Sequence, residues 1–165
     1  MWQPYASAIA YGQKCIETRG FDTRYRGPLL IHAALKDAPQ CRTVHRWATD
    51  RGLLPAKIPY GAIVAYTELV ATYTTDQLRD VIGVTTVERQ FGDFTTGRFG
   101  WRLANVKRFA EPIPWKGSQG FFNVPESMIA DALTNVIDCG SPGIIFPTAT
   151  NTQAPPEVAQ GRLWQ

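Results

Sequence analysis

Residues 60–75, YGAIVAYTELVATYTT, constrain the fold more than any other part of the chain. The stretch is rich in β-branched and aromatic residues, which favour strands. Side chains alternate along a strand, and both alternating sets here are mostly apolar, so neither face of this strand suits water. We therefore expect the strand to lie in a covered sheet or a small closed barrel, with other elements packed against it.

Shorter helical and extended patterns flank this strand along the chain. Helices are expected over residues 3–12, 40–52, 75–83 and 125–137, and further strands over 14–19, 29–32, 98–109 and part of 111–125. This mixture predicts an α+β fold in which the strands close a small β-barrel with flanking helices. Pro and Thr become frequent after Cys139, so we expect one domain over residues 1–138 and an extended or mobile tail over residues 139–165.

Length and composition fit one globular domain, because the chain has 165 residues, of which 44% are hydrophobic and 19% charged. No window approaches the roughly 18 apolar residues of a membrane span, and the first residues lack the layout of a secretory signal. The 3 cysteines are scattered, and Cys41 with His45 supplies only two ligands on one expected helix face. These features predict a cytoplasmic protein with no membrane segment, metal site or cofactor.

Basic residues are concentrated in the first part of the chain. Residues 1–60 hold nine Lys and Arg against four Asp and Glu, whereas the remainder holds eight against ten. The formal net charge is only +3, so the distribution says more than the total. A one-sided basic surface is the minimum that a nucleic-acid-binding protein needs, and an aromatic content of 12% offers rings that can stack on bases.

The segment GQKCIETR, residues 12–19, holds the most concentrated candidates for chemistry. The chain has no G-x-S-x-G, P-loop or G-x-G-x-x-G motif and only two histidines, which leaves lysine, carboxylate and hydroxyl groups. An enclosed Lys14 could act as a base or as a cation for phosphate, or the segment could be an exposed ion-pair cluster. Along a regular strand Glu17 and Arg19 share one face, and Lys14 joins them only if the chain bends.

Three segments resemble the activating signal cointegrator homology (ASCH) domain of the PUA-like superfamily. They are QPYASAIAYGQKCIETR at residues 3–19, YRGPLLIHAA at 25–34 and PIPWKGSQGFF at 112–122. The resemblance implies a small PUA-like β-barrel with helices at its sides and a cleft lined by the G-x-K-x-x-E-x-R segment. Family members are associated with RNA binding. Some resemble single-strand ribonucleases, and others are amidohydrolases that remove the acetyl group of acetylcytidine.

The same resemblance implies roles for individual residues. Lys14 matches the family lysine and Arg19 the family arginine, whereas Glu17 stands where the amidohydrolases have threonine, which disfavours the acylcytidine reaction. The late segment adds Ser118 on a loop expected to face the cleft, so the candidate catalytic residues are Lys14, Glu17 and Ser118. The candidate ligand-binding residues are Tyr5, Arg19, Arg24, Arg26, Arg98, Trp115, Lys116 and Gln119. Among them, cations suit phosphates and rings suit base stacking.

The leading hypothesis is an RNA- or nucleotide-binding domain with a basic, aromatic-edged cleft. A metal-independent hydrolase, either a single-strand ribonuclease or an amidohydrolase on N4-acylated cytidine, is the first alternative. A protein-interaction adaptor that makes no use of the cleft is the second. We expect RNA, a nucleoside or a nucleotide as the partner, with a protein partner also open and no membrane.

Overall fold

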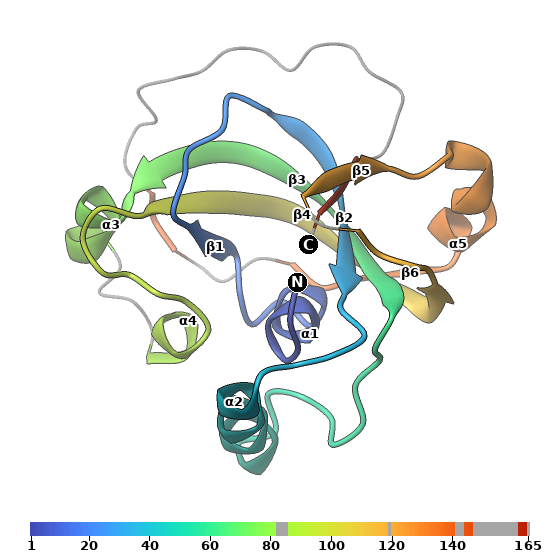
Figure 1. Ribbon diagram of the computed structural model, residues 1–165, viewed down its shortest axis with the longest axis horizontal. Coiled ribbons are helices and arrows are strands. Elements are labelled where there is room, and N and C mark those ends of the chain that lie inside the picture. The colour runs from blue at the N-terminus through green and yellow to red at the C-terminus, as the bar shows by residue number, and fades with distance from the viewer. Residues whose placement is uncertain (82–85, 119, 141–143, 147–161, 165) are drawn as a thin grey trace.

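The computed structural model describes residues 1–81, 86–118, 120–140, 144–146 and 162–164. A curved sheet forms its centre, and short helices lie around the sheet (Figure 1). The strands are β1 (Ile16–Arg19), β2 (Gly27–Ala33), β3 (Ala62–Thr74), β4 (Phe99–Pro114), β5 (Phe121–Asn123), β6 (Val136–Asp138) and β7 (Arg162–Trp164). The helices are α1 (Tyr5–Ala10), α2 (Pro39–Asp50), α3 (Thr75–Val81), α4 (Thr86–Gln90) and α5 (Ala130–Thr134), with a 3-10 helix over Glu126–Met128. The predicted α+β class is confirmed.

The strands follow the order β1-β4-β3-β2-β7-β5, and β6 pairs with β4. The pairings are antiparallel except that of β2 with β7, which is parallel. The long strands β3 and β4 shift register at three places along their pairing. Such irregularities bend strands and increase their twist, so the sheet curls. The curl brings the ring of Trp101 on β4 onto Phe121 of β5, with the ring centres 5.9 Å apart and the planes nearly parallel.

The predicted closure into a barrel is not confirmed. Among the described residues no hydrogen-bonded pairing joins β1 to β5, so the sheet is open along this path. Both end strands are short, with 4 residues in β1 and 3 in β5. They offer few backbone groups for a further ladder. The curved sheet instead brings side chains of distant strands together, as Trp101 and Phe121 show.

The strand predicted within residues 60–75 is confirmed as β3, and both of its faces are covered. Val64 packs with Ile9 of α1 in one buried cluster. Ile63, which points to the other face, packs in a second cluster with Ile129, the residue before α5. A strand that is apolar on both faces is stable here because helical segments cover both sides.

Most of the other expected elements are present with shifted ends. Helices α1, α2 and α3 fall in the expected helical segments, and β1, β2 and β4 fall in the expected strands. Two differences stand out. Helix α4 was not expected, and the helix expected over residues 125–137 is instead a 3-10 turn, the short helix α5 and the strand β6. Val136 and Ile137 are β-branched and pair with β4, which ends the helix before them.

The predicted tail is only partly described, because residues 141–143 and 147–161 lie outside the described part. Phe146 stacks on Tyr73, and the backbone of β7 pairs with β2 and β5. The boundary at residue 138 therefore stays a prediction. Within the ranges described, no helix combines the length and apolar character needed to cross a bilayer.

Candidate functional site

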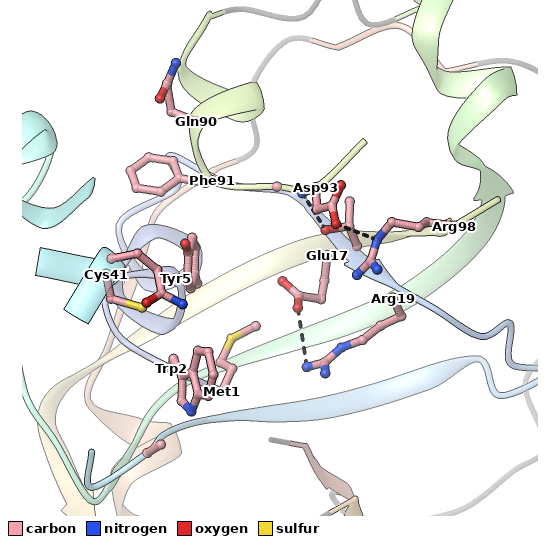
Figure 2. A pocket seen from close by; sticks show the side chains of 14 residues that line it. Met1, Trp2, Tyr5, Glu17, Arg19, Cys41, Gln90, Phe91, Asp93 and Arg98 are labelled. Carbon is pink, nitrogen blue, oxygen red and sulfur yellow. Dashed lines mark hydrogen bonds and ion pairs between the residues drawn. The ribbon is translucent and has the colours of Figure 1, made fainter. Parts of the chain in front are cut away.

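A cavity of about 720 Å³ opens between α1, β1, α2 and the segment that contains α4 (Figure 2). This volume is typical of a small-molecule pocket. We call its lining residues the cavity wall. The wall carries four charged side chains, Glu17, Arg19, Asp93 and Arg98, and three aromatic ones, Trp2, Tyr5 and Phe91.

Lys14 reaches Glu17 because the chain bends after α1. Gly12 has a φ of 68°, in the left-handed region that favours glycine. The Lys14 amide then donates to the Ala8 carbonyl over 3.1 Å. As a result, Lys14 Nζ lies 3.3 Å from Glu17 Oε2. The convergence that the sequence left conditional on a bend is therefore present in the structure.

Lys14 lies beneath the cavity wall, since its side chain has no exposed surface and is not part of the lining. Its ammonium donates to the Ile16 carbonyl and lies 3.9 Å from Glu88 Oε1. Glu88 is equally buried and accepts the backbone amides of Cys15 over 2.9 Å and Ile16 over 3.1 Å. Lys14, Glu17 and Glu88 form what we call the ion cluster. The cluster ties α4 to β1 and holds Glu17 in place.

Burial shifts the proton affinities of several groups around this cluster. It raises the pKa of Glu88, and Lys14 with the two amides opposes that rise. It also raises the pKa of the Cys15 thiol, with Glu88 adding to the effect, so Cys15 is not a thiolate nucleophile at neutral pH. Burial lowers the pKa of Arg19, while the Glu17 carboxylate opposes the shift. The charged forms in this region therefore depend on one another.

Two ion pairs lie on the cavity wall. Arg19 Nη2 lies 3.3 Å from Glu17 Oε1, and Arg98 Nε lies 3.3 Å from Asp93 Oδ2 (Figure 2). The Asp93 amide donates to Thr18 Oγ1 over 2.9 Å, which holds the segment after α4 against β1. Each pair joins one acid to one base, so the side-chain charges of the wall balance.

Aromatic side chains border the cavity across from Glu17 (Figure 2). Trp2 is 52% exposed, and Tyr5 on α1 is half-buried. Burial raises the pKa of Tyr5, with Cys41 and Glu17 adding to the rise, so its hydroxyl keeps its proton at neutral pH. The cavity thus combines a charged side on β1 with an aromatic side at the start of the chain.

The sequence matches the family model of the ASCH domain over residues 1–113. The chain belongs to the ASCH domain family. The match contains every residue of the cavity wall, because the wall residues lie between Met1 and Arg98. ASCH domains are associated with RNA binding. A search of curated proteins finds no match to the chain.

This ASCH domain brings four of the predicted ligand-binding and catalytic residues to one wall. They are Tyr5, Glu17, Arg19 and Arg98. Lys14 contacts Glu17 from behind and is not placed to touch a ligand in the cavity. The predicted loop residues Lys116 and Ser118 are exposed and do not line the cavity, and Gln119 lies outside the described residues.

The remaining predicted residues have surroundings of other kinds. Arg26 is buried and donates to the carbonyls of Thr23 and Tyr25 and to Thr72 Oγ1, so it braces the connection between β1 and β2. Trp115 is half-buried, and its carbonyl lies 2.9 Å from a ring nitrogen of His32. Arg24 is exposed and does not line the cavity. No ligand role of these residues follows from their positions.

Several residues at or beneath the cavity were not predicted from the sequence, and three of them contribute to its charge or its aromatic edge. Glu88 is the buried partner of Lys14, Asp93 pairs with Arg98, and Trp2 borders the opening. A buried lysine requires a buried anion, but the sequence left open whether Lys14 is buried, so it gave no signal for Glu88. Asp93 follows α4, and its backbone hydrogen bond to Thr18 of β1, which local sequence does not indicate, brings it to the wall.

Proposed function

We propose that this ASCH domain binds single-stranded RNA and accepts one unpaired nucleotide into the cavity. The observation that carries the proposal is the Glu17–Arg19 pair, which lies on the wall of a cavity of about 720 Å³ with buried Lys14 behind it. The association of the family with RNA supports this class of ligand. In this proposal the cavity reads the base and leaves the phosphates outside.

The chemistry of the pair is complementary to a base edge. A carboxylate accepts hydrogen bonds and a guanidinium donates them. Unpaired bases present donors beside acceptors on their Watson–Crick edges, and proteins that bind single-stranded RNA read these edges directly. Glu17 and Arg19 project from the same face of β1, so a base in the cavity can meet both groups at once.

The balanced charge of the wall favours a base over a phosphate. Glu17 offsets Arg19, and Asp93 offsets Arg98, so a phosphate in the cavity would lie near two carboxylates without a net positive field. A neutral base does not have this penalty. The exposed ring of Trp2 offers a surface for stacking on a base, which contributes about 1–3 kcal/mol per base in single-strand binders.

The hydrolase alternatives have less support in the cavity. Lys14 is not on the wall, and neither is Ser118, so these two candidate catalytic residues do not face a ligand there. The aliphatic hydroxyl on the wall belongs to Thr18, whose oxygen accepts the Asp93 amide. A cleft blocked by side chains would favour the adaptor alternative, whereas the cavity is open.

Fluorescence anisotropy with a short labelled single-stranded RNA at low salt tests the proposal. Glu17→Gln and Arg19→Gln should each weaken binding about 10- to 100-fold, the loss expected when a hydrogen bond to a charged group is removed. Free nucleosides should compete with the RNA, because the cavity accepts a single base. Thermal unfolding of each variant shows whether the protein is still folded.

Two exposed positions outside the wall provide matched controls. Glu111→Gln and Arg79→Gln make the same changes of charge and should leave the affinity within about twofold of the unaltered protein. Equal affinities for Glu17→Gln, Arg19→Gln and the controls would refute a role of the pair in binding. The same samples should be incubated with RNA in EDTA and with acylated cytidines, since turnover in either assay would replace the binding proposal with the hydrolase one.

A further inference from the structure

Helix α2 (Pro39–Asp50) forms a wall that two neighbouring hollows share. Gln40 and Cys41, near its start, line the cavity described above. The following turns line a second groove of about 550 Å³, to which Arg42, His45 and Arg46 contribute. A chain leaving the cavity along α2 therefore passes directly over these side chains.

The arginines of α2 differ from those of the cavity wall in having no acidic partner. Arg42 and Arg46 are exposed, and no ion pair within the described part of the chain includes either of them. Arg19 and Arg98, in contrast, are each paired with a carboxylate. The two guanidinium groups of α2 are therefore available to an anion from outside.

The charge of the whole chain is located around this helix. Residues 36–57 contain five Lys and Arg against two Asp, a net +3 that equals the formal net charge of the chain. The other residues hold 12 basic against 12 acidic side chains and are neutral overall, since the chain has 17 and 14 in total. Both aspartates, Asp37 and Asp50, line the groove, and Asp37 accepts a hydrogen bond from the Tyr60 hydroxyl over 3.1 Å. Arg42 and Arg46 are matched in number by these two aspartates, so the basic excess is contributed by Lys36, Arg51 and Lys57 on the flanks of α2.

We propose that α2 binds the sugar–phosphate backbone of the RNA, with Arg42 and Arg46 each holding one phosphate. This inference rests on the proposed function, because it continues the strand whose base lies in the cavity. Residues four apart on a helix lie on one face, slightly more than one turn or ~6 Å apart along the axis. That separation is comparable to the distance between neighbouring phosphates of an extended single strand.

Arginine is suited to this task because its planar guanidinium donates two parallel hydrogen bonds to phosphate oxygens. Contacts of this kind position a nucleic acid without reading its sequence. The wall of the cavity has no net positive charge to attract phosphates, so affinity for the RNA backbone has to come from a different surface. The unpaired arginines beside the cavity provide that surface.

The test measures the salt dependence of RNA binding by anisotropy. For single strands, the logarithm of the binding constant falls with the logarithm of salt by about 0.7 per phosphate neutralised. Arg42→Gln with Arg46→Gln should therefore reduce the slope by about 1.4. Arg79→Gln with Lys107→Gln removes the same charge from two other exposed positions and should leave the slope unchanged.

The outcomes separate this inference from the proposed function. If the α2 variant keeps the slope of the control variant, the inference is wrong, and an acidic protein segment becomes the better partner for this surface. If the salt dependence of RNA binding is weaker in the α2 variant while free nucleosides still compete with the RNA, both proposals stand. If the salt dependence is weaker in the α2 variant while the Glu17→Gln and Arg19→Gln variants bind RNA normally, the proposal that α2 binds phosphates stands and the cavity proposal fails.

Discussion

Replacing Lys14 by methionine removes the cation of the ion cluster while keeping an unbranched side chain in a buried position. In the unaltered protein the ammonium lies 3.3 Å from Glu17 and 3.9 Å from Glu88. At an effective dielectric constant of about 20, these distances correspond to gross attractions of about 5 and 4 kcal/mol. The net loss in the free energy of unfolding is smaller, because a buried carboxylate that loses its cation can take up a proton.

Protonation sets a ceiling on the loss and makes it depend on pH. Without Lys14, the folded-state pKa of Glu88 rises well above its unfolded value of about 4.3. At pH 7, about 2.7 pH units above the unfolded pKa, keeping this one carboxyl protonated lowers the free energy of unfolding by at most about 3.7 kcal/mol, at 1.36 kcal/mol per unit. At pH 5 the same cost is about 1 kcal/mol. A carboxyl with a raised folded-state pKa is fully accommodated below its unfolded pKa and loses stability as the pH rises, so the penalty must grow from pH 5 to pH 7.

Urea unfolding of both proteins at pH 5 and pH 7 measures this penalty as a shift of the midpoint at constant slope. Adding Glu88→Gln to Lys14→Met should recover part of the loss at pH 7, because it removes the carboxylate that lacks a cation. A loss below about 1 kcal/mol at pH 7, or one that is equal at both pH values, would show that Lys14 is not held by the two carboxylates.

Two further changes test the packing around the site. Gly100→Ala would place a Cβ 2.2 Å from Leu78 Cδ1 and 2.8 Å from Ile16 Cγ2, and should lower the free energy of unfolding by about 1–3 kcal/mol in urea titrations, whereas Gly20→Ala, which meets no atom within 4 Å, should be neutral. His32 is buried, and burial lowers its pKa, so below about pH 6.5 the unfolded chain binds more protons than the folded protein and stability should fall with acidification. His32→Gln should make the free energy of unfolding less dependent on pH in this range, and an equal pH dependence in both proteins would contradict the argument.

The sequence predicted best where a single physical constraint dominated. The strand within residues 60–75 was evident because a stretch that is apolar on both alternating faces has few other solutions. The shared face of Glu17 and Arg19 followed from strand alternation alone. The bend that brings in Lys14 did not, because it depends on the left-handed conformation of Gly12 packed beside Cys139, far along the chain.

The errors arose where distant segments decide the outcome. Helix α4 is five residues long, and its anchor is Glu88, whose role depends on a lysine more than 70 positions away. The end of the expected helix at 125–137 becomes β6 because β4 offers an unpaired edge there. A closed barrel requires a backbone ladder between the first and last strands of the sheet. Among the described residues, the short strands β1 and β5 do not pair with each other. Local propensity contains none of this information.

In the two proposals, the cavity with balanced charge and the surface of α2 divide the recognition of RNA between them. If the wall were basic, phosphates would bind there whatever base followed, and the Glu17 carboxylate would serve no purpose. If α2 were neutral, the affinity of one base in one cavity would have to hold the whole strand. Phosphate contacts give affinity without selectivity, and base contacts give selectivity at lower affinity. Under the proposed function the ion cluster would serve the second task, because a carboxylate that reads a base edge must stay in one position, and Lys14 holds Glu17 from the buried side of the wall.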